Sequence, residues 1–394
     1  MKKWHYLSVF AVCLILAGCF FFWPSAESGR GVASTSNYPD MMFVQTVDPD
    51  LGEAFEDGYP NEKHYISNVI DTFVKFIQDV HAKESQDKVH RGAHAKALAC
   101  LKGHLEVENQ GLAPALRVGL FAQNAKSYKA WIRISNSDQD PKKPDSMQNT
   151  RGFAIKLLGV DGEKLLDADQ KPMTHDLVMV AAENFIARDN KNYPQIADGT
   201  ETTLGLFFRL GPIKVFQLSQ AVSKAKKEPN PLKLPFFSTT AYRLGPAEGP
   251  KTKIKFGISL CNSNDLSKFA TSQDLSKNIE ETLRRTDVCY ELKVQEGRPQ
   301  DNVEDATTGW PSADHTVAKL WIKSDENSVG FTPERQEFCE NLSFSPWHAL
   351  DVHRPLGRIN RARHAAYMAS SVFRHAANTV TPAEPTEQSF DDIH

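Results

Sequence analysis

Two side chains near the C-terminal end of the sequence are spaced to share one face of a helix. The segment Asn360–Tyr367 reads NRARHAAY, and Arg363 lies four residues before Tyr367. A guanidinium beside a phenol stabilises the phenolate, and a phenolate can serve as an axial ligand of ferric heme iron. On spacing alone, the commoner arrangement is a solvent-facing arginine with the tyrosine packed on the core, so the other motifs must decide.

A histidine with basic neighbours lies in Arg91–Lys96, which reads RGAHAK. The imidazole of His94 could act as a general base, although a lone histidine is more often a surface residue. His90 and His94 also have the helical spacing of two metal ligands. A zinc protease is nevertheless excluded, because no glutamate follows His90 and Gly92 disfavours a helix there.

Three further stretches, WIRIS, RGFAIK and FIARD, each place a charged residue in strand-like or loop sequence. Together with the first two motifs, and in this order, they resemble the heme catalase superfamily from about residue 88 to residue 375. The matches to that family's motifs are Arg91–Lys96 (R-x-x-H-A-[KR]), Arg133–Ser135 (R-F-S), Arg151–Lys156 (R-G-F-A-x-K), Phe185–Asp189 with Tyr193-Pro194 (F-F-x-R-D, aromatic-Pro), Trp310-Pro311 (W-P) and Arg363–Tyr367 (R-x-x-x-Y).

The resemblance implies a role for each matching residue. Tyr367 would be the axial metal ligand to the iron of heme b, with Arg363 as its charge partner. His94 would be the distal acid–base group that moves a proton between the two oxygens of a peroxide, and Ser135 would orient His94 by a hydrogen bond. The other matches would contact the cofactor: Arg91, Arg133 and Arg374 at the propionates, and Phe185 and Tyr193 as aromatic neighbours.

The sequence departs from the family pattern on the distal side. Aligning Asp176–Val178 with the family's D-L-V places its distal asparagine at Val180, followed by Ala181. Asn184 is displaced from that position by four residues. A lost donor to the peroxide costs on the order of 10²–10³ in rate. The resemblance therefore implies that peroxidase or organic-hydroperoxide activity is less affected than catalase turnover.

Two other departures concern partners. Ser238–Thr240 stands where many family members have a histidine that contacts NADPH, so bound NADPH is not expected. Little but an acidic tail follows the Tyr367 helix, so the family's tetramer, which longer C-terminal segments build, is not expected either.

The remaining sequence predicts the elements that would position these residues. Apolar residues at helical spacing predict a helix over Tyr65–Ala82, and three more helices are expected at 203–227, 273–285 and 357–377. Strands are expected at 105–108, 129–135, 152–158, 177–181, 237–244, 252–261, 289–295 and 317–323. So many spaced strands predict an α+β fold, an antiparallel β-barrel with flanking helices. The heme domain is expected at 61–378, and the polar tail 379–394 is expected to be disordered.

The N-terminus predicts export. Lys2 and Lys3 precede an apolar run from Tyr6 to Trp23, which is about 27 Å long as a helix and matches a bilayer core. Residues 1–24 thus read as a signal peptide or a membrane anchor, and 25–60 as a tether. The alternative of a lipoprotein cleaved before Cys19 stays open. Each reading places the body outside the cytoplasm.

Composition and cysteine spacing narrow the partners. A net charge of -3 without a basic patch excludes nucleic acid as a partner. No CxxC pair exists among the six cysteines, which argues against a structural zinc site. The sequence leaves open whether Cys100, Cys261, Cys289 and Cys339 are thiols or disulfides.

The sequence therefore predicts a heme enzyme that removes hydrogen peroxide or organic peroxides, exported and attached to the outer face of a bacterial membrane. One alternative is rearrangement of lipid hydroperoxides, which suits a membrane-attached protein. Another is a heme-binding protein without catalysis, which would need Arg363 and Tyr367 but not His94 with Ser135. The reducing donor and the oligomeric state stay open.

Overall fold

The structure is a computed structural model that describes residues 61–84, 88–147, 150–166, 173–197, 200–261, 266–327 and 331–393. The leader and tether expected at 1–24 and 25–60 lie outside these residues. Within the described part of the chain, no helix combines the length and the apolar character needed to cross a membrane.

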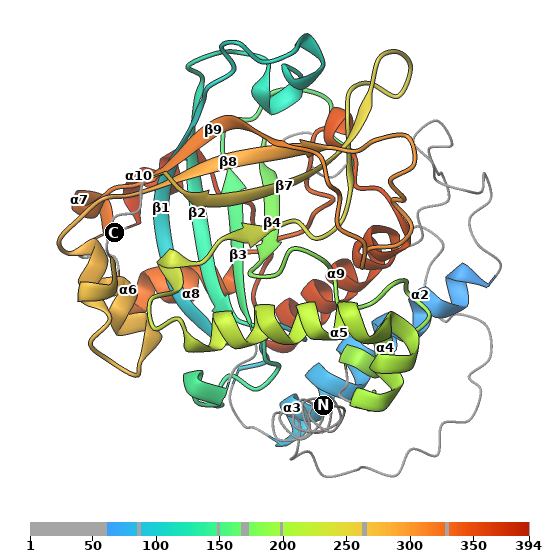
Figure 1. The fold of residues 1–394 in the computed structure, drawn as a ribbon. Coiled ribbons are helices and arrows are strands. Elements are labelled where there is room, and N and C mark those ends of the chain that lie inside the picture. The colour runs from blue at the N-terminus through green and yellow to red at the C-terminus, as the bar shows by residue number, and fades with distance from the viewer. Residues whose placement is uncertain are drawn as a thin grey trace, which may run out of the picture.

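The centre of the fold is a closed antiparallel β-barrel of eight strands (Figure 1). Its strands follow the order β1, β2, β3, β4, β5, β7, β8 and β9, and β9 returns to pair with β1. A short ninth strand, β6, pairs with β7 beside β5. The bounds are β1 Ala97–Val107, β2 Ser127–Asn136, β3 Arg151–Leu157, β4 His175–Val180, β5 Phe236–Phe237, β6 Tyr242–Leu244, β7 Thr252–Leu260, β8 Val288–Glu296 and β9 Asp314–Ile322. The predicted antiparallel barrel with flanking helices is confirmed.

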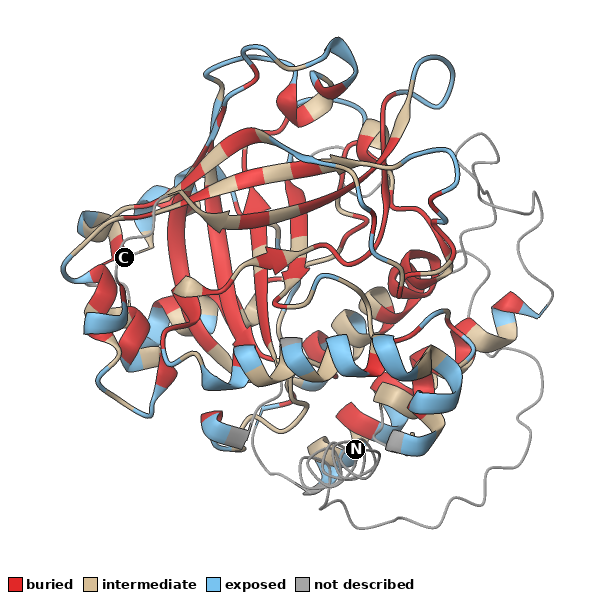
Figure 2. Ribbon diagram, viewed as in Figure 1, coloured by how far each residue is buried: buried red, intermediate tan, exposed pale blue. Residues whose placement is uncertain are grey.

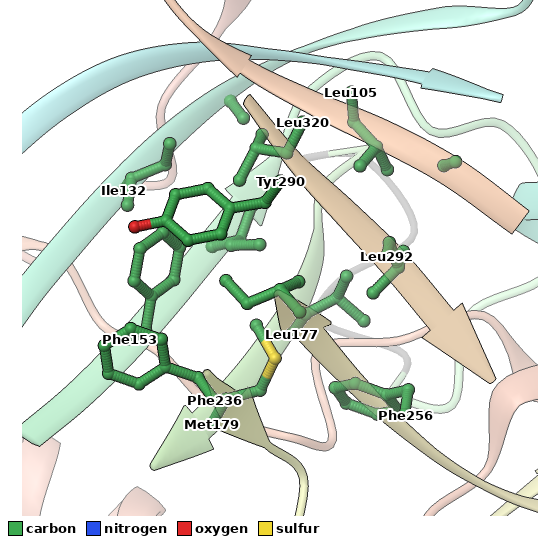
Figure 3. Close-up of a cluster of buried hydrophobic side chains, with 14 of the residues drawn as sticks. Leu105, Ile132, Phe153, Leu177, Met179, Phe236, Phe256, Tyr290, Leu292 and Leu320 are labelled. Carbon is green, nitrogen blue, oxygen red and sulfur yellow. The ribbon is translucent and has the colours of Figure 1, made fainter. Parts of the chain in front are cut away.

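Alternation of side chains along the strands fills the barrel with apolar residues. In β8, every second residue from Val288 to Val294 is buried, as expected for a strand with one face in the core. The rings of Phe153, Phe236 and Tyr290 meet there, with centroids 4.9 and 5.5 Å from that of Phe153 (Figure 3). The interior is thus a packed core, so a functional site must lie outside it.

Helices cover the barrel (Figure 1). They are α2 Glu62–Asp71, the π-helical η3 Thr72–Gln78, α3 Asp79–Glu84, α4 Tyr193–Ala197, α5 Thr203–Lys227, α6 Leu275–Leu283, α7 Ser324–Asn327, α8 Pro333–Asn341, α9 Arg358–Ala377 and α10 Glu387–Asp392. Short 3-10 helices lie at Pro114–Leu116, Gly119–Phe121, Asp145–Met147, Pro231–Lys233, Leu266–Phe269 and Asp351–His353. Apolar faces of α2 and η3 pack against the alanines of α9, and this contact holds α9 in place.

Three expectations differ from the structure. The strand expected at 105–108 is the end of a longer strand, β1, which begins at Ala97. The strand expected at 237–244 is divided into β5 and β6, because Thr239 adopts a left-handed φ of 60° that interrupts the ladder. The tail expected to be disordered contains α10, whose capping box at Thr386 fixes its start. Phe390 is 3% exposed and packs on the ring of Trp131 at 5.4 Å, so one buried aromatic orders this helix.

Two disulfides crosslink the chain, and the first of them is buried. Cys100 on β1 pairs with Cys339 on α8 across 239 residues, and Cys261 pairs with Cys289 across 28 residues. A crosslink restricts the unfolded chain more when its loop is longer. Replacing Cys100 and Cys339 by alanine is therefore expected to lower the free energy of unfolding by about 5 kcal/mol, against about 3–4 for the other pair. Guanidinium unfolding of both double variants measures this, and a reversed order would contradict it.

Candidate functional site

His94 lies just before β1 and is held in an unusual backbone conformation. Its φ is 56°, in the left-handed region that residues other than glycine seldom adopt. Arg133 Nη2 donates to the carbonyl oxygen of His94 at 2.9 Å and so stabilises this conformation. The imidazole Nδ1 lies 3.1 Å from Ser135 Oγ on β2. The fold thus brings the two predicted catalytic residues into hydrogen-bond contact.

One face of strands β2, β3 and β4 lies against the imidazole of His94. The register pairs Ser135 with Gly152 and Gly152 with Val180, so these positions share one face of the sheet. A Cβ atom on Gly152 would lie 2.5 Å from His94 Nδ1 and 2.8 Å from Ser135 Oγ. Glycine therefore leaves the space that this pair occupies. Val180 is next in the row, and Phe237 on β5 follows it.

The electrostatic surroundings keep His94 neutral. Burial, followed by the positive charges of Arg133 and Arg363, lowers the pKa of His94 to about 4. At neutral pH the imidazole therefore carries no charge, and one ring nitrogen can accept a proton. Ala93, next to His94, packs against the cluster that α2 and η3 form with the alanines of α9, so His94 lies near α9 although the two are far apart in the sequence.

Helix α9 presents Arg363 and Tyr367 one turn apart. Arg363 Nη2 donates to Tyr367 Oη at 3.3 Å. Its Nη1 donates to Asn360 Oδ1 at 3.1 Å and to Thr240 Oγ1 at 3.2 Å. Arg363 is 7% exposed, so the solvent-facing arrangement that spacing alone favoured is wrong for this arginine. The break between β5 and β6 places Thr240 where its hydroxyl oxygen accepts from Arg363 and orients the guanidinium.

The guanidinium of Arg363 stays protonated and positively charged. Burial by itself would lower the pKa of Arg363, but the phenol oxygens of Tyr367 and Tyr242 outweigh burial and raise it. The guanidinium is buried among three tyrosines, because Tyr193 also contributes to this shift. A permanent positive charge is thus held at hydrogen-bond distance from the oxygen of Tyr367.

Three arginines converge on Glu340, near the end of α8. Arg91 Nη1 lies 2.7 Å and Arg133 Nη2 3.3 Å from Glu340 Oε2. Arg374 donates to the carbonyl oxygens of Glu340 and Leu342. Burial and the neighbouring charge of Arg91 lower the pKa of Arg374 to about 9 and that of Arg133 to about 10. Three guanidiniums around one carboxylate leave an excess of positive charge, which favours further anionic groups at this position.

Aromatic side chains occupy the space beside Tyr367. The rings of Phe185 and Tyr193 lie 5.0 Å apart, and Phe73 of η3 lies 5.7 Å from Tyr193. Burial, then the neighbouring Tyr367, raises the pKa of Tyr193, so its phenol stays protonated. Both predicted aromatic neighbours of the cofactor are therefore together, close to the proximal pair.

Asn184 does not take the place of the missing distal asparagine. Its Oδ1 accepts from Lys255 Nζ at 3.4 Å, and a Cβ atom added to Gly309 would lie 3.5 Å from its Nδ2. Asn184 thus belongs to the loop around residue 309. Val180 keeps the place beside Gly152 on the His94 face, as the alignment in the sequence predicted.

Four contributing residues were not predicted from the sequence. Glu340 lies on α8, whose sequence lacks a marked apolar periodicity, and nothing in it signals a partner for arginines. Thr240 and Asn360 act through Arg363, and Gly152 acts by lacking a side chain. Asn360, three residues before Arg363, is the one that helical spacing could have indicated.

Comparison with solved structures shows which fold this is. A fungal catalase crystal structure matches with a TM-score of 0.55 and 16% identity, over 78% of this chain and 64% of that one. A bacterial catalase matches with a TM-score of 0.58 and 16% identity, over 91% of this chain and 70% of that one. Catalase A from Saccharomyces cerevisiae matches with a TM-score of 0.56 and 17% identity, over 91% of this chain and 75% of that one. This chain therefore spans about two thirds of the length of the fungal catalase.

No family model and no curated protein matches the chain. At this level of identity, the likeness to the solved structures concerns the fold. The eight-stranded antiparallel barrel, the covering helices and the three structural matches together show that this protein has the catalase-like fold.

Proposed function

We propose that this protein is a heme-dependent peroxidase of the catalase type, which decomposes hydrogen peroxide or organic peroxides. One observation carries the proposal: a neutral histidine paired with a serine faces the same region as a buried arginine–tyrosine pair. The first pair can move a proton, and the second can hold a ferric iron. A protein that bound heme without catalysis would need the second pair alone, so His94 with Ser135 argues against that alternative.

The residues present fit heme b in three respects. Tyr367 has a phenol oxygen in contact with a buried cation, which suits a tyrosinate ligand of ferric iron. The cluster of Arg91, Arg133 and Arg374 has a surplus of positive charge over Glu340, which suits two propionates. Phe185 and Tyr193 offer the aromatic surface that a porphyrin packs against.

Heme, when bound, would supply the redox chemistry by which the oxygen–oxygen bond of a peroxide is broken. The chain's own contribution is proton transfer and orientation. In the tautomer in which Nδ1–H donates to Ser135 Oγ, Nε2 of His94 is the proton acceptor for the peroxide and returns the proton to the leaving oxygen. Arg133 holds the backbone of His94, so the imidazole is oriented before the substrate arrives.

The distal face favours organic peroxides as substrates. Val180 and Phe237 continue the row of Ser135 and Gly152, so the face ends in apolar side chains. A hydrogen peroxide molecule gains no hydrogen bond from them, whereas an alkyl group gains apolar contact. This observation supports lipid-hydroperoxide rearrangement as a second candidate function.

Heme uptake tests the proposal directly. The purified protein is supplied with hemin, and the Soret band is recorded for the unchanged chain and for Tyr367→Phe. We expect a ferric tyrosinate spectrum that the variant loses. Oxygen release from hydrogen peroxide and disappearance of cumene hydroperoxide are then followed in parallel. Absence of Soret binding to the unchanged chain would overturn the proposal, and rearranged products from a fatty-acid hydroperoxide would favour the second candidate.

The pH profile should reflect His94. Because the pKa of this imidazole lies near 4, its neutral form predominates above about pH 5 and is lost as the pH falls through 4. We expect peroxide turnover to stay level from pH 5 to 8 and to fall below pH 5. Stopped-flow rates, with the Soret band recorded at each pH, separate this loss from release of heme. A fall centred near 6.5 would contradict the assignment.

Gly152→Ala should lower activity without removing heme. The added methyl group would overlap His94 Nδ1 and Ser135 Oγ, so the imidazole must move. Turnover is expected to fall about 10²-fold, as for a misplaced catalytic group. Ala154→Gly, a change on the same strand away from His94, is the control, and equal losses in the two variants would contradict the role of Gly152.

We also propose that the body works outside the cytoplasm, attached through residues 1–24. The apolar run after Lys2 and Lys3 supports this location. The two disulfides support it independently, because such bonds persist mainly in oxidising compartments.

A further inference from the structure

Helix α5 exposes large apolar side chains to solvent. Leu204, Phe207 and Phe208 are 64, 42 and 78% exposed, and Ile213 and Phe216 are 72 and 51% exposed. Figure 2 shows pale blue along the outer side of α5 over its whole length. Soluble proteins seldom leave so many large apolar side chains together in water, and such a surface generally has a partner.

The exposed residues follow the geometry of the helix. Gly211, with a φ of 79°, and Pro212 divide α5 into two segments. In the second segment, all exposed residues except Pro212 and Lys226 lie within an arc of roughly 100° at 100° per residue. They are Ile213, Phe216, Gln217, Gln220, Lys224 and Lys227. The opposite side, with Val215 and Ala225, is buried against the body. One face of the helix is thus fixed to the protein, and the other is left outside.

The charges on α5 have a single sign. The helix contains Arg209, Lys214, Lys224, Lys226 and Lys227 and no aspartate or glutamate. Arg209 and Lys214 contact acidic residues, Glu201 at 2.7 Å and Asp305 at 3.8 Å. The three lysines of the last turn are exposed. The outer face therefore changes from apolar in its first half to basic at its end.

We propose that α5 is a membrane-contact helix that lies on an anionic phospholipid surface. Phenylalanine and leucine side chains enter the boundary between headgroups and acyl chains, and lysines beside them attract anionic headgroups. This is the combination found on helices that lie in a membrane interface. A protein partner or a second copy of this chain explains the apolar residues, but neither accounts for a uniformly basic end as an anionic lipid surface does.

The position of the first described helix, α2, agrees with this proposal. Asn190 Nδ2 donates to Glu62 Oε1 at 3.1 Å, so the first described helix begins beside the segment that leads into α4 and α5. The apolar run from Tyr6 to Trp23 lies upstream of this point in the sequence. The membrane-contact helix is independent of the proposed peroxide chemistry, since none of its exposed residues belongs to the heme site.

Carbene footprinting of the full-length protein tests the proposal. A photoactivated diazirine labels the protein in the presence of either phosphatidylcholine vesicles or vesicles that also contain phosphatidylglycerol. The labelled peptides are then analysed by mass spectrometry. We expect labelling of residues 203–217 to fall to a small fraction with phosphatidylglycerol. Labelling of the exposed residues 313–315, at the start of β9, should stay constant.

Two sets of substitutions separate charge from apolar contact. Changing Lys224, Lys226 and Lys227 to glutamine removes about fivefold in lipid affinity for each lysine, so half-protection should need roughly 100-fold more vesicles. Phe207→Ser with Phe208→Ser should abolish protection of the first segment. Labelling that is unchanged by phosphatidylglycerol would overturn the proposal. So would labelling that falls as protein concentration rises without vesicles, because a second copy would then cover the helix.

Discussion

Replacing His94 with alanine is expected to lower peroxide turnover about 10²–10⁴-fold, the range lost when a general acid–base group is removed. The imidazole is neutral and hydrogen-bonded to Ser135, so it is ready to accept a proton at neutral pH. His94 contributes the nearest titratable atoms to the space against Gly152 and forms the hydrogen bond with Ser135. Heme uptake should be retained, because Tyr367 and the three arginines are unchanged.

The design must allow for the backbone at this position. His94 has a φ of 56°, and alanine adopts this region less readily than asparagine does. His94→Asn is therefore the second variant, since it tolerates the conformation and cannot act as a base at neutral pH. His90→Ala, four residues earlier and close to Glu340, is the matched control. Rates are measured by stopped flow, with the Soret absorbance giving the heme content of each variant.

The outcomes are distinct. Loss of turnover in both His94 variants, with heme content unchanged and His90→Ala close to normal, is the expected result. Unchanged turnover in His94→Asn would show that His94 is not the base. Loss of heme from both variants would contradict the assignment of Tyr367 and the arginines as the cofactor's principal contacts.

The chemistry of individual residues explains how the sequence could indicate candidate site residues. Few side chains can hold a ferric iron or move a proton, so Tyr367 and His94 stand out once their neighbours match a motif. Strand and helix periods placed most elements correctly, and α5 was predicted with the bounds that the structure has. Local signals were sufficient because each of these patterns lies within a few residues.

What the sequence did not reveal depends on contacts between distant residues. Glu340 meets Arg91 across 249 positions and carries no local sign of this pairing. Thr240 reaches Arg363 because the ladder breaks at Thr239, although strand propensity continues through that segment. Phe390 orders a polar tail through contact with Trp131, which composition cannot indicate. In each case tertiary contact, and not local preference, determines the outcome.

The register of β3 and β4 predicts a large effect of substituting Val180 on hydrogen peroxide turnover. Val180 is paired with Gly152, whose missing side chain faces His94 and Ser135, so residue 180 lies on the distal face. An amide there would donate a hydrogen bond to a peroxide oxygen, which valine cannot do. Val180→Asn is therefore expected to raise oxygen release from hydrogen peroxide by about 10²–10³, the value of one well-placed donor in a transition state.

The same strand offers a matched control. Val178 is partly exposed like Val180 and lies on the same face, but it pairs with Ala154 and not with Gly152. Val178→Asn thus introduces an equal polar change one pair further from the imidazole. Oxygen release from hydrogen peroxide and loss of cumene hydroperoxide are measured for both variants at equal heme content.

Selectivity between the two substrates is the decisive quantity. The alkyl group of cumene hydroperoxide packs against the apolar end of the distal row, where Phe237 follows Val180. An amide at position 180 removes part of this contact, so turnover of the organic substrate should stay level or fall while hydrogen peroxide turnover rises. Equal changes for both substrates, or equal gains from Val178→Asn, would show that position 180 does not select the peroxide. A rise confined to hydrogen peroxide and to Val180→Asn would mean that one side chain directs this site toward organic peroxides.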